Sequence, residues 1–288
     1  FNVRRAGLQA VAKELGISLA EFDKGEIVPH HDALLNKRFL IARGVLAADG
    51  LVSLPKLKAH GLMRFTGAVK NQFGCVPGLE KSQHHLRMPD PYDFAAMLVD
   101  LNTLLKPRLF IMDGIAAMEG NGPRSGKLRN LGALLFSSDP VALDAVACRL
   151  INLEPVFVPT AAAGERAGLG TYRAENIEVV GDRVEKLVIA DFDVPRQPPG
   201  CATGGRLRSF LKNRLCPRPM IDASRCNRCG TCVQVCPVTP KAVDWRGGEK
   251  TGPPAYDYDR CIRCFCCQEL CPEGAISVRE TLPGRVFR

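Results

Sequence analysis

Two cysteine runs with one shared spacing lie near the end of the chain. The first run reads Cys226-x2-Cys229-x2-Cys232-x3-Cys236-Pro237, and the second reads Cys261-x2-Cys264-x2-Cys267-x3-Cys271-Pro272. A 4Fe-4S cube needs four thiolates that converge from different directions, and a tight loop of this spacing supplies three of them. The fourth comes from elsewhere, and in paired runs it ligates the other cluster. The pattern therefore predicts two cubane clusters.

The predicted ligand sets cross between the two runs. The first cluster takes Cys226, Cys229, Cys232 and Cys271, and the second cluster takes Cys261, Cys264, Cys267 and Cys236. Zinc sites and disulfides are the alternatives. Structural zinc sites usually use two cysteine pairs rather than two runs of four. Disulfides need an oxidising compartment, whereas we expect a chain without a secretory signal peptide. Cluster ligation is therefore the stronger interpretation.

These runs resemble those of the bacterial two-cluster ferredoxin family over residues 218–278. The resemblance implies a small, pseudo-symmetric α+β module that moves single electrons. It covers only the last part of the chain, so it leaves the role of the preceding residues open.

Arginines repeat together with the cysteines. Arg225 and Arg228 correspond to Arg260 and Arg263, so both halves read Arg-Cys-x-Arg-Cys. In one interpretation these arginines are solvated loop residues. In the other, a nearby guanidinium favours the reduced cluster, which carries more negative charge, and so raises its potential. The second interpretation predicts clusters that are less strongly reducing than those of an acidic ferredoxin.

Composition limits the remaining function classes. A chain of 288 residues with 46% apolar residues can form one large and one small domain. It contains no run of apolar residues long enough for a transmembrane helix. The formal charge of +9 falls to about +5 with two clusters bound. The lower positive charge argues against nucleic-acid binding as the function. The sequence also has no RNA-binding aromatic motif or helix-turn-helix signal. The chain starts at Phe1, so we expect further residues upstream.

The first 190 residues alternate between helix and strand signals. Apolar spacing predicts helices at 8–15 and 94–105, and Asp139-Pro140 predicts the start of a helix that runs to about 151. Short apolar runs predict strands at 109–112, 133–136 and 176–180. We therefore expect an α/β fold with a mainly parallel sheet and flanking helices, followed by the small α+β ferredoxin-like domain. In such sheets, ligands favour the loops at the carboxyl ends of the strands.

Basic side chains occupy two of these predicted loops. In an extended chain Lys56, Lys58 and His60 would project to one face, where they could bind a phosphate or a carboxylate. Lys70 lies between Gly67 and Gly74, which would let the backbone approach a ligand. The alternative is a solvated basic edge that protects the sheet from aggregation.

Two carboxylates flank the third predicted loop, which spans residues 112–123. Asp113 follows a predicted strand and Glu119 precedes a glycine-rich stretch, so they could hold a divalent metal or act as acid and base. The alternative for Asp113 is a loop-capping carboxylate. His84 and His85 are adjacent and would point opposite ways in an extended chain, so at most one serves as a ligand or base. No Walker or Gly-x-Gly-x-x-Gly pattern supports nucleotide binding.

Five motifs in the first 185 residues resemble one family of uncharacterised proteins. They are Leu54-Pro-Lys-Leu-Lys-Ala-His60, Gly67-Ala-Val-Lys-Asn-Gln-Phe-Gly74, Met112-Asp-Gly114, Met118-Glu-Gly-Asn-Gly-Pro123 and Ser138-Asp-Pro-Val-Ala-Leu-Asp144. The family is the domain of unknown function 362, which is often fused to a two-cluster ferredoxin module. Ala59 stands where the family more often has Thr. Members usually carry a longer N-terminal part with a Lys-Pro-Asn motif, and the family implies no established reaction.

The expected organisation has three parts: an α/β domain at 1–190, a basic Pro/Gly linker at 191–217 with a short helix near 207–215, and the two-cluster domain at 218–288. One function class is electron transfer, with the large domain binding a redox partner protein or a small anionic ligand. The second is a reductase whose anionic substrate or cofactor is held by Lys56, Lys58, His60 and Lys70, with Asp113 and Glu119 as metal ligands or proton donors. The third is a cluster-bearing maturation factor or scaffold. Thiolate ligands and spare thiols favour a cytoplasmic location.

Overall fold

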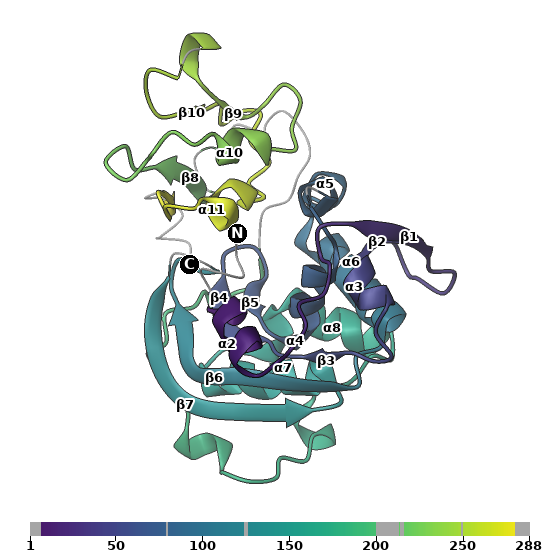
Figure 1. Cartoon of the computed structure of the whole chain (residues 1–288). Coiled ribbons are helices and arrows are strands. Elements are labelled where there is room, and N and C mark those ends of the chain that lie inside the picture. Colours follow the sequence, from purple (N-terminus) through teal and green to yellow (C-terminus); the bar gives the residue numbers. More distant parts are fainter. Residues whose placement is uncertain are drawn as a thin grey trace.

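The computed structural model describes residues 7–78, 80–123, 126–199, 213, 216–248 and 250–279. It contains a larger α/β part followed by a small module that carries the cysteine runs (Figure 1). The module lies to one side of the larger part, and its helix α11 (Cys266–Leu270) is on the side that faces the larger part (Figure 1).

A mixed five-stranded sheet forms the centre of the α/β part. β3 (Val52–Ser53) and β4 (Lys56–His60) follow each other along one side of β6 (Leu109–Glu119), and both run parallel to it. β5 (Arg64–Thr66) pairs antiparallel with β4, and β7 (Lys127–Ser137) pairs antiparallel with the other side of β6. Three of the five strands thus share one direction, and the predicted α/β class is confirmed. A separate hairpin joins β1 (Gly25–Pro29) to β2 (Arg38–Ala42).

The described helices of this part are α2 (Leu8–Glu14), α3 (Arg43–Leu46), α4 (Ala68–Asn71), α5 (Glu80–Arg87), α6 (Pro91–Leu105), α7 (Pro140–Leu150) and α8 (Pro159–Arg166). Three of these seven, α2, α6 and α7, correspond to the helices predicted from the sequence. Asp139 caps α7 by accepting from Val141 N and Ala142 N, as the Asp-Pro pair predicts. Asp90 caps α6 in the same way, so that helix starts before the expected residue 94.

A buried carboxylate joins α7 to the start of α4. Asp144 is 4% exposed, and its two oxygens accept from Ala68 N at 2.5 Å and Val69 N at 3.1 Å. Gly67 precedes these amides, and a Cβ on it would overlap the Asp144 carboxylate. Burial raises the pKa of Asp144 to about 7. Two of the sequence motifs therefore meet for a packing reason, since one supplies the carboxylate and the other the space for it.

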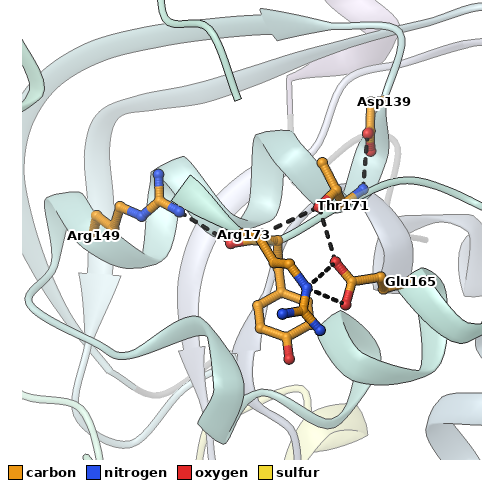
Figure 2. Close-up of polar contacts among 6 residues, drawn as sticks. Asp139, Arg149, Glu165, Thr171 and Arg173 are labelled. Atoms are coloured by element: carbon orange, nitrogen blue, oxygen red, sulfur yellow. Dashed lines mark hydrogen bonds and ion pairs between the residues drawn. The ribbon is translucent and has the colours of Figure 1, made fainter. Parts of the chain in front are cut away.

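The loop after α8 is fastened to α7 by a small polar network (Figure 2). Thr171 N donates to Asp139 Oδ2, and the Thr171 hydroxyl donates to Glu165. Arg173 forms an ion pair with Glu165 at 3.0 Å, and Arg149 donates to the Tyr172 carbonyl. The prediction of a strand at 176–180 is wrong. The chain forms a 3-10 turn at Ala174–Asn176, and Val180 is 88% exposed, because no neighbouring strand pairs with this segment.

The core of the α/β part extends past residue 190. Phe192 and Val194 are buried in the same apolar cluster as Leu57 and Phe110. The segment that follows the predicted domain end thus packs against the sheet. Of the short helix predicted at 207–215, all residues except Asn213 lie outside the described residues.

The C-terminal module has the two-fold repeat expected of its sequence. β8 (Arg218–Ile221) pairs antiparallel with β11 (Ile276–Arg279), and β9 (Val243–Asp244) pairs antiparallel with β10 (Ala255–Tyr256). The short helices α10 (Thr231–Gln234) and α11 each begin within a cysteine run and contact each other. The predicted small α+β domain is confirmed.

Candidate functional site

Two cavities inside the module gather the eight cysteines of the two runs. The first cavity is lined by Cys226, Cys229, Cys232 and Cys271. The second cavity is lined by Cys236, Cys261, Cys264 and Cys267. Each cavity therefore combines three cysteines of one run with the last cysteine of the other, which is the donor set a 4Fe-4S cube requires.

The backbone around the cavities has the tight turns that converging thiolates need. Arg228 and Arg263 have left-handed φ values of 60° and 63°, and Gly230 and Phe265 occupy the next equivalent left-handed positions. A left-handed φ is unusual for a bulky residue such as Phe265, so the loop holds it there against its local preference. The same unusual turn occurs in both halves and aims three side chains inward.

Hydrogen-bond donors already point at the cysteine sulfurs. Ala275 N lies 3.3 Å from Cys271 Sγ, and Ala242 N lies 3.4 Å from Cys236 Sγ. The Tyr256 hydroxyl donates to Cys267 Sγ at 3.2 Å. Donors to the sulfurs stabilise thiolate charge and raise the cluster potential. The residues present thus fit two 4Fe-4S clusters by donor set, backbone shape and donors to sulfur.

The two cavities differ in their access to solvent. Cys229 is exposed and Cys226 is half-buried, whereas Cys236, Cys261 and Cys267 are buried. Cys266, which lies off the ligand register, is a buried thiol beside the second cavity. Elsewhere, Cys75 and Cys148 are buried free thiols, and Cys216 is disulfide-bonded.

A hydrogen bond joins the α/β part directly to the ligand-bearing helix of the module. His60, at the end of β4, lies 2.9 Å from Glu269 through Nε2 and Oε1, with side-chain exposures of 1% and 23%. His60 Nδ1 accepts from Leu62 N and Met63 N. The ring proton therefore lies on Nε2 and is donated to Glu269. Burial lowers the pKa of His60 to about 4, so the ring is neutral at neutral pH.

Three lysines and a second histidine face the same carboxylate. We call Lys58, His60, Lys70, Lys81 and His85 the basic cradle. Burial lowers the pKa values of Lys58 and Lys81, and the charge of Lys70 lowers both further. Burial also lowers the pKa of His85 to about 4. Burial alone would raise the pKa of Glu269, but Lys70 and the bond from His60 hold it below its usual range.

Sequence reasoning found part of this cradle. Lys58, His60 and Lys70 come together around Glu269, although Glu269 itself carried no signal in the sequence. Lys81 was not predicted, and His84 and His85 were considered only in an extended chain, whereas both lie in α5. Positions four residues apart share one helix face, so reading this segment as a helix would have paired Lys81 with His85.

The other three predicted site residues lie elsewhere. Lys56 Nζ binds Asp113 Oδ2 at 2.6 Å, and both side chains are 42–50% exposed. The prediction of a loop after residue 112 is wrong, because β6 continues to Glu119. Asp113 and Glu119 are thus about 20 Å apart along one strand and do not share a metal ion. Glu119 instead accepts from Asp193 N. In the described part of the chain, no three His, Cys, Asp or Glu residues lie close enough to hold a single metal ion.

The glycine-rich stretch after β6 contacts the module. The Asn121 carbonyl accepts from Gln268 Nε2 at 3.2 Å, and Asn121 Oδ1 accepts from Val278 N at 3.3 Å. A Cβ on Gly122 would overlap the carbonyl of Ala59 in β4, so glycine lets this stretch lie against the strand. This motif is a docking loop, and it meets α11 next to the His60 contact.

Comparison with known proteins identifies the two parts. Residues 2–149 match the family model described as "Domain of unknown function (DUF362)", and residues 218–272 match the "4Fe-4S dicluster domain". A curated relative is the "Thylakoid-associated protein sll1697" of Synechocystis sp., 38% identical over 201 residues. The match covers 66% of this chain and 62% of the relative, so the chain spans less than two thirds of that protein. No described helix is long and apolar enough to cross a membrane.

Proposed function

Because the chain belongs to the DUF362 family and carries a 4Fe-4S dicluster domain, we propose that it transfers electrons through two clusters in the C-terminal module. A dicluster domain implies iron-sulfur electron transfer in general. The finer proposal has two parts. The α/β domain fixes the position of the cluster module, and its basic cradle binds a small anionic ligand beside α11.

The proposed ligands are Cys226, Cys229, Cys232 and Cys271 for the first cluster, and Cys261, Cys264, Cys267 and Cys236 for the second. The composition of the two cavities supports this crossed assignment. Each cluster supplies one-electron chemistry when bound, and the chain supplies the thiolates, the donors to sulfur and the shielding from water. We also propose a redox partner protein, since no electron donor lies within the described residues.

The contact between His60 and Glu269 carries the docking part of the proposal. Glu269 lies two residues from both Cys267 and Cys271, which belong to different clusters. Holding Glu269 therefore holds the short segment that connects both clusters. The Asn121 loop adds two further hydrogen bonds at the same side of the module.

Unbalanced charge supports a small anion in the cradle. Lys58, Lys70 and Lys81 face one carboxylate, so three positive charges meet one negative charge among these residues. The two histidines are neutral and do not change this balance. Partly buried like charges repel each other strongly, and a phosphate or dicarboxylate would relieve the repulsion.

A reductase is the second candidate function, in which the bound anion is the substrate. The observation in its favour is that the cradle surrounds a residue placed between ligands of both clusters. Anion binding alone does not separate the two candidates. Oxidation of the reduced protein by the anion, at a rate that follows anion concentration, would separate them. No contact among the described residues favours the maturation-factor alternative.

Anaerobic purification of the full chain followed by metal analysis tests the cluster part, with about eight iron atoms per chain expected. Calorimetry with inorganic phosphate and with a dicarboxylate tests the cradle. We expect Lys70→Ala to remove binding and to leave the cluster absorbance unchanged. Lys56→Ala is the matched control, because Lys56 pairs with Asp113 outside the cradle and should bind as the wild type does. Equal binding by both variants would refute the anion site.

We propose domain limits near residues 190 and 218, and the core of the first domain reaches Val194. We also propose that the protein lies in the cytoplasm, next to a membrane. Eight cluster thiolates favour reducing surroundings. The relative's description as thylakoid-associated points to a membrane surface. Fractionation of cells into soluble and membrane pools would test this placement.

A further inference from the structure

The Arg-Cys-x-Arg-Cys repeat places one arginine at the same point of each cluster loop, and the two arginines have different environments. Arg228 and Arg263 share the left-handed backbone. Arg228 is exposed, and its Nη1 donates to the Thr251 carbonyl at 3.2 Å. Arg263 is 5% exposed. A symmetric sequence thus produces an asymmetric placement of charge.

Neutral groups, rather than a carboxylate, hold the guanidinium of Arg263. Its Cζ lies 5.1 Å from the centroid of the Tyr258 ring, and its Nη2 donates to Asn213 Oδ1 at 2.6 Å. Its Nε and Nη1 are buried and have no hydrogen-bond partner among the described residues. By contrast, Arg260 in the same half pairs with Asp257 at 3.2 Å.

A guanidinium stays charged in a protein, so burying it without a counter-ion is strongly unfavourable. Arg263 lies between Cys261 and Cys264 in the sequence, and both line the second cavity. A 4Fe-4S cluster with four thiolates has a net negative charge and would supply the missing counter-charge. We propose that Arg263 is the buried counter-ion of the second cluster and makes it the higher-potential cluster of the two. This inference rests on the proposed ligand sets.

The backbone donors to the last cysteine of each run are matched between the two cavities. Ala275 N donates to Cys271 Sγ in the first cavity, and Ala242 N donates to Cys236 Sγ in the second. Thr231 and Tyr256 each place a hydroxyl near a cysteine, at 3.3 Å from Cys229 and 3.2 Å from Cys267. The two arginines are the main difference in charge at equivalent positions.

Burial acts on the potential in two opposing ways. A less solvated cluster accepts an additional negative charge less readily, which lowers the potential of the second cluster. A guanidinium in the same low-dielectric region attracts that charge several times more strongly than an exposed one does. The proposal requires the second effect to be the larger, and the contrast between screened Arg228 and buried Arg263 is its basis.

A direction for electron flow follows. The first cluster is the accessible one, because Cys229 is exposed. With both clusters bound, a donor would lose one electron to the first cluster, and that electron would pass on to the second cluster, leaving the first oxidised again. A single electron on the module would then reside mainly on the second cluster.

Redox titration of the anaerobic full-length holoprotein, followed by EPR, tests this inference. Iron and sulfide analysis comes first, so that a wild type without two clusters refutes the proposed function and not the role of Arg263. With both clusters present, we expect two separate midpoints. Arg263→Gln should lower the higher midpoint by about 59 mV or more, a tenfold loss in the ratio of reduced to oxidised cluster at a fixed potential. Arg228→Gln, the matched control, should move its midpoint much less.

Arg263→Lys keeps the charge and separates charge from shape. The midpoint potential of the second cluster in Arg263→Lys should stay close to that of the wild type. If Arg263→Gln loses half of its iron, Arg263→Lys should still bind the full amount. The inference is overturned if the wild-type midpoints coincide, if Arg263→Gln shifts the lower midpoint, if both glutamine variants shift equally, or if the lysine and glutamine variants lose iron alike.

Discussion

The carboxylate of Asp144 fills the space that a side chain on Gly67 would need. Asp144 Oδ1 and the Phe65 ring both lie within overlap distance of a Cβ placed on Gly67. The same carboxylate accepts from Ala68 N and Val69 N, so it cannot move without leaving two buried amides unpaired. Gly67 and Asp144 thus form one packing unit.

Gly67→Ala should destabilise the α/β part by about 1–3 kcal/mol, because the added methyl group must displace a hydrogen-bonded carboxylate. Gly74→Ala is the matched control from the same motif, since nothing lies within 4 Å of a Cβ there. Thermal unfolding followed by circular dichroism measures both. A Gly67→Ala melting temperature equal to that of Gly74→Ala would show that the carboxylate is easily displaced.

Glu269→Ala should loosen the contact between the two parts of the chain. It removes the acceptor for His60 and leaves the charges of Lys58 and Lys70 without their carboxylate. Because the Leu62 and Met63 amides are tied to the His60 ring, hydrogen exchange in the peptide that covers them should speed up. Glu273→Ala, in the same module but exposed, should leave that peptide unchanged.

Stability should fall below about pH 6.5 because His85 resists protonation. Burial lowers its pKa to about 4 in the folded state, with Lys70 lowering it and Glu269 raising it. The unfolded chain binds the proton near pH 6.5 and the folded chain does not. The stability contributed by neutral His85 is therefore complete above pH 6.5 and is lost as the pH falls toward 4.

Between pH 6.5 and 5 the part of the loss due to His85 should be about 2 kcal/mol, from about 1.4 kcal/mol per pH unit for one proton. His60, whose pKa burial also lowers to about 4, should add a similar part. His85→Gln should show a shallower slope than the wild type. Anaerobic unfolding at each pH, with iron content checked to exclude cluster loss, supplies the measurement. Identical slopes would mean that His85 is not the titrating group.

Lys56→Met should change stability by less than about 1 kcal/mol. Lys56 and Asp113 form a well-placed pair, but both are about half exposed, and exposed ion pairs contribute little. Denaturant unfolding at low and high salt measures this. A larger loss of stability would contradict the view that this pair is an ordinary exposed ion pair.

The elements that sequence reasoning recovered are those whose signals are local. Asp139-Pro140 marks the start of α7, and the cysteine spacing marks the module. The extension of β6 to Glu119 was not predicted because only one face of this strand is buried. Asp113 and Gly114 interrupt the apolar run and resemble the start of a loop, although both pair with β7.

The candidate site shows the same limit. Lys58, His60 and Lys70 were selected because they are basic and near glycines, which is a local property. Their partner Glu269 is about 200 residues away, and its carboxylate matters only after the two parts have docked. A contact between distant segments leaves no periodic pattern in a single sequence, so no reading of spacing could have found it.

The position of Gln268 and Glu269 between Cys267 and Cys271 has a consequence for assembly. The residues that hold the two parts together lie on a segment with a cluster cysteine at each end. Because bound clusters would fix both of these ends, we expect cluster loading to precede closure of the interface. A chain that loses its iron through oxidation should also release its module, and the exposed interface would then mark the damaged molecules for proteolysis.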